Sequence, residues 1–183
     1  MDKYRIGLIG APCSGKSTTA AEVFARCKML GIPAGHVKEY IAELFARGWN
    51  FETVSDQMFI YDEQKRREDD FPENIKVVIT DSPVLLTYFY GVVNANDTLH
   101  DRLVLCKLYE YFLSNVSRYD LLVFLERTHD YENDGVREQD ECEANEIHMY
   151  LMSLLNIHGI KYKVLPCNTA SDAIMEIIEN EVL

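Results

Sequence analysis

The sequence predicts an α/β fold in which a five-stranded parallel sheet is covered by helices on both faces. Short runs of apolar and β-branched residues alternate with longer segments of helical periodicity. The short runs are apolar without interruption, as in strands that are buried on both faces. No repeat and no Gly/Ser-rich linker divides the chain. Its 183 residues are therefore expected to form one domain, residues 1–183.

The five expected strands differ in the strength of their signal. Residues 76–80 (KVVIT) and 121–125 (LLVFL) have the composition of buried strands, whereas residues 36–38 are only weakly strand-like. The complete set of expected strands is residues 4–9, 36–38, 76–80, 121–125 and 162–165.

The segments between the strands are expected to be helical, and helix breakers mark several of their ends. Gly31 and Pro33 end the first helix, Pro72 ends the third, and Ser171 is expected to be the N-cap of the last. The expected helices are residues 16–30, 40–47, 54–70, 85–93, 101–117, about 138–158, and 171–181.

Composition excludes several classes of protein. The chain is 48% hydrophobic and 26% charged, which is an ordinary globular balance. With 30 acidic and 18 basic residues its net charge is −12, so binding of duplex nucleic acid is not expected. No run approaches the roughly 18–20 apolar residues of a membrane span, and the first residues do not read as a secretory signal. Five widely spaced cysteines without a Cys-x-x-Cys pair favour a reducing cytoplasm over a disulfide or zinc scaffold.

One motif matches a phosphate-binding loop in full. The sequence GAPCSGKS at residues 10–17 fits G-x-x-x-x-G-K-[ST] between a predicted strand and a predicted helix. Its glycines permit a tight turn whose N–H groups point at phosphate oxygens, and Lys16 is expected to reach the β- and γ-phosphates. Ser17 is expected to bind Mg²⁺ and Thr18 the α-phosphate. The residues expected to bind the nucleotide are Gly10, Ala11, Pro12, Cys13, Ser14, Gly15, Lys16, Ser17 and Thr18.

Two acidic residues directly follow predicted strands. Asp81 comes after residues 76–80, in the arrangement of a Walker B aspartate, and Glu39 comes after residues 36–38. Ligands of open α/β sheets bind beyond the carboxyl ends of the strands, so we expect both acids to face one crevice. We expect one of the two acids to serve the metal and the other the acceptor hydroxyl. The candidate metal-binding residues are Asp81 and Ser17. Alternatively, Asp81 is a helix N-cap and Glu39 is an exposed loop acid.

A strongly acidic segment follows the fourth strand. Residues 126–146 contain nine acidic residues and two arginines, and most of these acids are typical of a solvated surface. Arg127 and Arg137 are the exceptions, because a segment here could close over bound phosphates and bring arginine to the transferring group. We therefore expect a lid at about residues 127–137.

The third predicted helix carries polar side chains on one face. Gln57, Tyr61 and Gln64 recur at spacings of four and three residues, so they share a helical face. Two amides and a phenol suit the recognition of a polar acceptor, although an exposed helix side would show the same spacing. Arg66 and Arg67 are expected on the solvated side.

With these motifs in place, the chain resembles the P-loop kinases of the NadR-like group, which includes the ribosylnicotinamide kinase domain and many small phage and bacterial ATPases. The segments that carry the resemblance are residues 39–45, 57–64, 79–82 and 134–137, in the family's order. The resemblance implies a three-layer P-loop NTPase fold. It also implies a nucleoside-like acceptor near Glu39, Tyr40, Gln57, Gln64 and Asp81. Ala42 stands where the family usually has arginine, so ribosylnicotinamide does not carry over as the substrate.

The expected activity is an ATP-dependent kinase that uses Mg²⁺ to transfer the γ-phosphoryl group to a hydroxyl of a nucleoside-like small molecule. Ser82 stands where hydrolytic motors usually carry a glutamate, which favours transfer over hydrolysis. Kinases of nucleoside monophosphates or of hydroxymethylated bases in phage DNA remain alternatives. A nucleotide switch or a non-kinase ATPase are alternatives from another class, but the sequence lacks the Asn-Lys-x-Asp of guanine switches.

Overall fold

The computed structural model describes residues 3–128 and 141–182. In these residues five parallel strands form one sheet with the order β2-β3-β1-β4-β5. The strands are β1 (Tyr4–Ile9), β2 (Ala34–Val37), β3 (Val77–Thr80), β4 (Leu121–Glu126) and β5 (Lys163–Pro166). The predicted fold class and the predicted five-stranded parallel sheet are confirmed.

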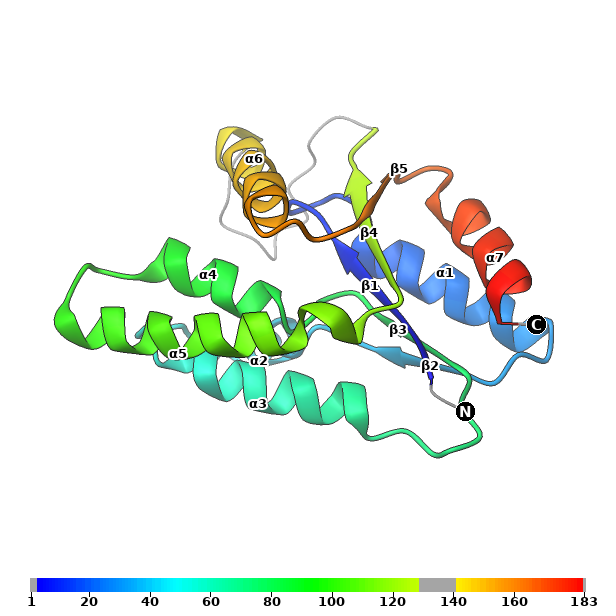
Figure 1. Cartoon of the computed structure of the whole chain (residues 1–183), viewed down its shortest axis with the longest axis horizontal. Coiled ribbons are helices and arrows are strands. Elements are labelled where there is room, and N and C mark those ends of the chain that lie inside the picture. Colours follow the sequence, from blue (N-terminus) through cyan, green and yellow to red (C-terminus); the bar gives the residue numbers. More distant parts are fainter. Residues whose placement is uncertain (1–2, 129–140, 183) are drawn as a thin grey trace.

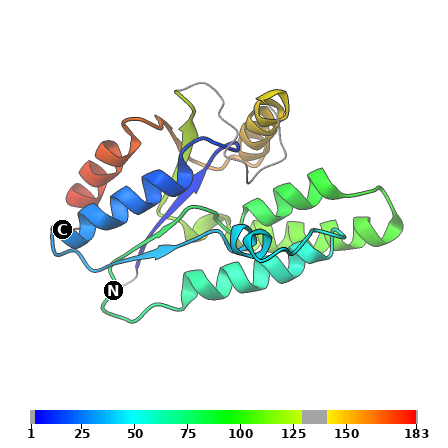
Figure 2. The same ribbon diagram turned by 180° about the vertical axis from the view of Figure 1, so that it is seen from behind.

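Helices cover both faces of this sheet (Figure 1). Figure 2, seen from behind, shows α1 lying along the sheet with α7 beside it, and residues of α3, α4, α5 and α6 pack on the opposite face. The helices are α1 (Lys16–Met29), α2 (Tyr40–Ala46), α3 (Asp56–Asp69), α4 (Leu86–Asn94), α5 (Leu99–Asn115), α6 (Glu141–Ile157) and α7 (Ala170–Glu181), with a 3₁₀ turn η1 (Val116–Arg118) after α5. None of the described helices is long and apolar enough to cross a membrane.

The two-sided covering explains why the strands are apolar without interruption. Along β4, Leu121, Val123 and Leu125 belong to the core between the sheet and helices α1 and α7. Leu122 and Phe124 point the other way and pack with residues of α3, α4, α5 and α6. Because successive side chains of a strand alternate between the faces, each face needs apolar residues at every second position.

Several predicted helix starts differ from the structure by one or two residues, and the starts of α7 and α5 show why. Ser171 is not the N-cap of the last helix: α7 begins at Ala170, Thr169 is the N-cap residue, and Ser171 lies buried in the first turn. Helix α5 begins at Leu99, two residues before its predicted start, because the side chain of Thr98 accepts a hydrogen bond from the N–H of Asp101. This capping contact satisfies an N–H that the helix itself leaves without a partner.

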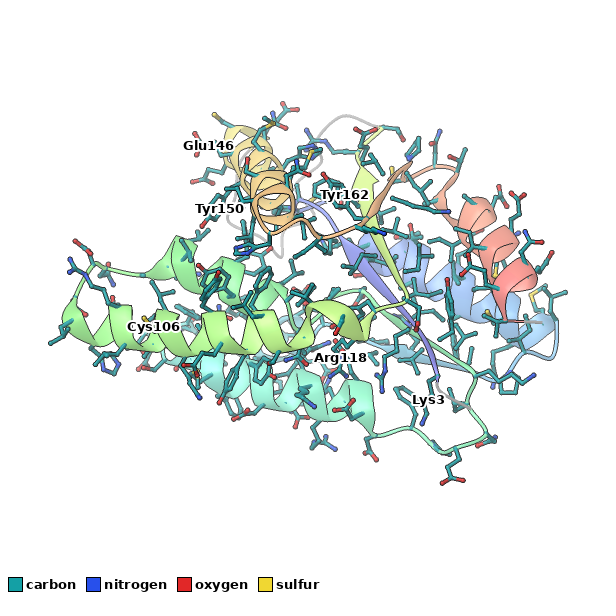
Figure 3. The ribbon with its side chains drawn as sticks, in the orientation of Figure 1. Lys3, Cys106, Arg118, Glu146, Tyr150 and Tyr162 are labelled. Atoms are coloured by element: carbon teal, nitrogen blue, oxygen red, sulfur yellow. The ribbon has the colours of Figure 1, made fainter. Side chains whose placement is uncertain are left out.

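A buried carboxylate joins three parts of the chain that are distant in sequence. Glu68, near the end of α3, is 1% exposed. It accepts hydrogen bonds from the Tyr119 hydroxyl (2.9 Å to Oε2) and from the N–H of Val84 (3.2 Å to Oε1). The Arg118 guanidinium lies 3.1 Å away, Nε to Oε2, where the end of α5 approaches α3 (Figure 3). Glu68 therefore fixes the loop between β3 and α4, which begins at Asp81.

Burial raises the pKa of the Glu68 carboxyl to about 7, although Arg118 and the hydrogen bonds from Tyr119 and Val84 act in the opposite direction. In the unfolded chain this carboxyl has its ordinary pKa of 4.5. Between these two values the folded chain keeps a proton that the unfolded chain has released. The stability gained from the neutral form is therefore complete below the unfolded pKa and is lost as the pH rises through the folded one.

We expect Glu68→Gln to change how stability depends on pH. Relative to the variant, the parent should lose free energy of unfolding by up to about 1.4 kcal/mol per pH unit as the pH rises from about 4.5 to 7. Urea unfolding followed by circular dichroism at several pH values measures this difference. Glu73→Gln, at an exposed glutamate, is the control and should track the parent. A difference that stays constant, or that grows in the parent's favour with rising pH, would show that Glu68 is ionised beside Arg118.

Candidate active site

The phosphate loop connects β1 to α1 and adopts backbone conformations that favour glycine. Gly15 has φ 80°, and Cys13, two residues earlier, also lies in the left-handed region with φ 59°. Residues of opposite hand in succession turn neighbouring N–H groups toward one side, which makes a concave site for an anion. Gly15 is also the N-cap residue of α1, and no side chain in the described residues caps this helix end. The loop therefore presents backbone donors at the positive end of a helix.

Lys16 lies over this loop. Its side chain is buried, and its Nζ donates hydrogen bonds to the carbonyl oxygens of Gly10 and Ala11, each at 2.9 Å. These oxygens hold the ammonium group in place but, being uncharged, do not cancel its charge. Ser17 and Thr18 are exposed in the first turn of α1. The predicted loop residues therefore come together as one cradle with a cation above it.

The register of the sheet brings both predicted acids to the edge where this loop lies. Thr80 of β3 pairs with Gly7 of β1 on one side and with Val37 of β2 on the other. Asp81 and Glu39 follow Thr80 and Val37 by one and two residues, so both leave the sheet at the same edge as the phosphate loop. This is the edge at which open parallel sheets bind their ligands.

Asp81 is a buried acid with unused hydrogen-bonding capacity. It is 3% exposed, and its Oδ1 has no hydrogen-bond partner among the described residues. Its Oδ2 lies 3.9 Å from Nε2 of His36 on β2. Because α4 begins only at Leu86, with Leu85 as the N-cap residue, Asp81 does not cap that helix. A buried carboxylate with an oxygen left over suits a bound cation or a ligand proton.

Glu39 occupies the N-cap position of α2 and is half-buried. It stands one strand further from the phosphate loop than Asp81, because β3 lies between β2 and β1. The two acids therefore line the same edge at different distances from the cradle.

Gln64 links the two segments that contain these acids. Its side chain is 2% exposed, and its Oε1 accepts a hydrogen bond from the N–H of Tyr40 at 2.9 Å. Its Nε2 approaches the Thr80 hydroxyl at 3.5 Å, and that hydroxyl accepts from the N–H of Ser82 at 3.3 Å. One amide thus contacts the residue after Glu39 and the residue before Asp81. That Gln64 binds the acceptor stays a prediction. The bridge between the two segments is a contact that the helical spacing of Gln64 did not indicate.

The other residues predicted to bind the acceptor are Tyr40, Gln57 and Tyr61, and they lie in different surroundings. The Tyr40 ring meets Phe59 edge-on at 5.6 Å, and Gln57 is buried in α3. Tyr61 has the contacts of a core residue: it stacks on Tyr111 at 4.3 Å, and its hydroxyl accepts from the amide of Asn115. A role in acceptor binding stays a prediction for all three.

Arg67 corrects the expectation that both arginines of α3 are solvated. Arg66 is 60% exposed, but Arg67 is only 24% exposed and forms a two-pronged ion pair with Glu43 at 2.8 and 2.9 Å. Its guanidinium also lies 4.5 Å from the centre of the Tyr40 ring. The sequence did not indicate these contacts of Arg67, because Glu43 and Tyr40 are more than twenty residues away in the chain.

Of the predicted lid, only its first two residues are described. Arg127 follows β4, and its guanidinium lies 3.1 Å from Oε1 of Glu141 at the start of α6. Arg137 and residues 129–140 lie outside the described residues. The lid and the role of both arginines remain predictions.

Cys167 is a neighbour of the phosphate loop that no sequence motif indicated. Cys167 follows β5, and a Cβ placed on Gly15 would lie 3.3 Å from the Cys167 Cβ. The Cys167 Sγ lies 3.2 Å from the hydroxyl of Thr128, which follows β4. The segments after β4 and β5 thus border the phosphate loop.

The candidate groups fit a magnesium ion that arrives with a nucleotide. No three His, Cys, Asp or Glu side chains gather as a ligand set in residues 3–128 and 141–182. Mg²⁺ prefers oxygen ligands and is usually bound through one or two protein oxygens together with substrate phosphates and water. The Ser17 hydroxyl and the buried Asp81 carboxylate, with its unpartnered oxygen, are groups of this kind.

Comparison with known proteins agrees with this architecture. The family model described as AAA domain matches residues 5–172. A search of curated proteins found no match. Among solved structures, NadR protein in complex with NR has a TM-score of 0.72 and 19% identity, over 98% of this chain and 51% of that chain. NadR in complex with NAD and AMP-PNP has a TM-score of 0.71 and 21% identity, over 95% and 49%.

Deoxyadenosine kinase from M. mycoides, with dCMP and dCDP bound, has a TM-score of 0.61 and 16% identity, over 96% of this chain and 98% of that chain. The chain spans about half the length of the NadR chains that it matches. At these identities the likeness concerns the fold. The chain thus belongs to the AAA domain family and has the P-loop fold that NadR and deoxyadenosine kinase also have.

Proposed function

We propose that this chain is a kinase that transfers the γ-phosphoryl group of ATP to a hydroxyl of a nucleoside-like small molecule. The observation that carries the proposal is the placement of Asp81 and Glu39 at the ends of adjacent strands, beside a phosphate loop with Lys16 over it. A simple nucleotide-binding loop needs no second acid at this edge. A phosphoryl transferase needs one group for the metal and another for the acceptor.

ATP as the donor is supported by the phosphate loop and by the NadR structure that contains AMP-PNP, an ATP analogue. In our proposal the loop N–H groups and Lys16 bind the β- and γ-phosphates. Ser17 and Asp81 would hold the Mg²⁺ that accompanies them, which would offset the charge that develops during transfer. The chain's own groups position the phosphates and provide a fixed electrostatic environment.

The positions of the two acids favour a division of labour. Asp81 is buried next to the strand that leads into the phosphate loop, which suits the metal. Glu39 is half-buried and one strand further away, which suits the acceptor. The acceptor oxygen forms a bond to the γ-phosphorus while the bond from that phosphorus to the β–γ bridging oxygen breaks. ADP leaves with that electron pair, and the hydroxyl proton passes to Glu39.

A nucleoside-like acceptor is supported by the surroundings of Glu39. Aromatic rings follow it along α2 and the next loop: Phe45 lies 5.9 Å from Trp49, which meets Phe51 edge-on at 6.2 Å. Planar aromatic side chains suit the stacking of a ring system. The structures that share the fold contain NR or deoxynucleotides, according to their descriptions.

The arginines of α3 argue for a nucleoside over a nucleoside monophosphate. Arg66 contacts Glu63 and Asp70, and Arg67 contacts Glu43 and Glu63. An acceptor phosphate would need cations that are not already paired with carboxylates. Ser82, in the place of the glutamate of hydrolytic motors, supports transfer rather than hydrolysis.

The acceptor can be identified by a transfer screen. ATP labelled at the γ-position and Mg²⁺ are supplied with ribosylnicotinamide, nucleosides, nucleoside monophosphates or DNA with hydroxymethylated bases, and the product is identified by mass. We expect label on a nucleoside-like molecule. Label released only as phosphate, at a rate independent of every acceptor, would contradict the proposal and favour a non-kinase ATPase.

Lys16→Ala should reduce transfer to background while the melting temperature stays near that of the parent, because the Lys16 Nζ donates to carbonyl oxygens of its own loop. Lys28→Ala changes an exposed lysine at the other end of α1 and should leave transfer unchanged. Equal turnover by Lys16→Ala and the parent would refute the role of the loop.

Asp81→Asn keeps the shape of the side chain but removes its charge, so we expect turnover to fall by about 10² or more, as when a transition-state charge partner is lost. The loss should appear in kcat, measured at saturating acceptor. Asp62→Asn, at an exposed position of α3, is the matched control. A kcat unchanged within twofold would show that Asp81 does not serve the metal.

A further inference from the structure

His36 lies on the same face of the sheet as Asp81, one strand away. In the register of β2 and β3, His36 pairs with Ile79. Asp81 is two residues beyond Ile79, so its side chain emerges on the same face because side chains alternate along a strand. Ile79 packs in the core beneath α1, and the His36 ring lies 6.0 Å from that of Phe24 on α1. The histidine is thus enclosed between the sheet and α1, beside the acid.

Both side chains contain buried polar atoms without a hydrogen-bond partner in the described residues. These atoms are Nε2 of His36 and Oδ1 of Asp81, and the histidine nitrogen lies 3.9 Å from the other oxygen of Asp81, Oδ2. The described residues contain only two other such atoms, and one of them, the Ser14 hydroxyl, is in the phosphate loop. Buried polar groups are nearly always hydrogen-bonded. Three unpartnered polar atoms at the phosphate loop and the strands beside it therefore indicate contacts that a ligand completes.

We propose that His36 is a positioning residue for Asp81. In the tautomer with a proton on Nε2, it donates to Oδ2 once the two groups approach by about 1 Å, to ordinary hydrogen-bond distance. This contact fixes the rotation of the carboxylate and leaves Oδ1 for the Mg²⁺ of the bound nucleotide. The inference rests on the proposed function, and it adds a residue of β2 to the machinery that binds the metal.

Two substitutions of His36 distinguish this role from simple packing. A histidine that only fills space next to Phe24 would be replaced well by another ring, whereas a donor to Asp81 would not. Removing a group that orients a metal ligand typically lowers metal affinity 10–100-fold. Phenylalanine keeps the ring and removes the donor, and glutamine places an amide N–H near the position of the imidazole Nε2.

The test measures binding of AMP-PNP by titration calorimetry, with Mg²⁺ and with EDTA. The quantity compared is the factor by which Mg²⁺ strengthens binding. We expect His36→Phe to reduce this factor about tenfold, to leave the affinity in EDTA unchanged, and to melt within a few degrees of the parent. His36→Gln should restore at least half of the lost factor on a logarithmic scale.

A double-mutant cycle adds a readout that a packing role would not produce. Asp81→Asn alone should abolish most of the enhancement by Mg²⁺, and adding His36→Phe to it should cause no further loss, because the histidine acts through the acid. Additive losses would overturn the proposal. So would a His36→Phe protein with the parent's enhancement, or a His36→Gln protein that behaves like His36→Phe.

Binding by the parent protein distinguishes failure of the His36 proposal from failure of the proposed function. If the parent binds AMP-PNP more tightly with Mg²⁺ and His36→Phe does the same, only the role of His36 is refuted. If the parent shows no Mg²⁺-dependent binding at all, the nucleotide site of the proposed function is refuted together with it.

Discussion

Parallel pairing of β1 with β3 and β4 determines where the candidate functional groups lie. All five strands of the sheet run in one direction, so every strand ends at the same edge. The phosphate loop follows β1, Asp81 follows β3, Glu39 follows β2, and the segments after β4 and β5 border the loop. Backbone hydrogen bonds therefore do what no single motif can do: they place groups from distant parts of the sequence within one small region.

This edge requires support because it gathers charge in a poorly solvated place. Asp81 is an acid at 3% exposure, and Lys16 is a cation at 6%. Buried charges are costly unless other groups compensate them. Helix α3 provides much of the surrounding structure. Gln64 accepts a hydrogen bond from the N–H of Tyr40 and contacts the hydroxyl of Thr80, and Glu68 accepts one from the N–H of Val84. The polar stripe of α3 is thus a scaffold for the loop that begins at Asp81, which explains why a mainly polar helix is packed against the core.

The parts of the fold that depend on local sequence were predictable. The eight-residue motif specified the phosphate loop, and uninterrupted apolar runs specified a sheet covered on both faces. Helix starts were less certain, since Thr169 rather than Ser171 precedes α7 and Thr98 extends α5. Contacts across the chain were not predictable. The neighbours of Arg67, Glu68 and His36 come from other elements, and only the register of strands and the docking of α3 bring them together.

The proposed function requires that a triphosphate lies in the cradle at the start of α1 with its last phosphate facing Asp81 and Glu39. A crystal structure of the protein grown with AMP-PNP and Mg²⁺ tests it most directly. We expect the γ-phosphate to contact Lys16 and the loop N–H groups. We also expect Ser17 and Asp81 to be the groups that bind the metal, with Glu39 on the open side. A nucleotide bound elsewhere, or a filled cradle with both carboxylates turned away from it, would contradict the account.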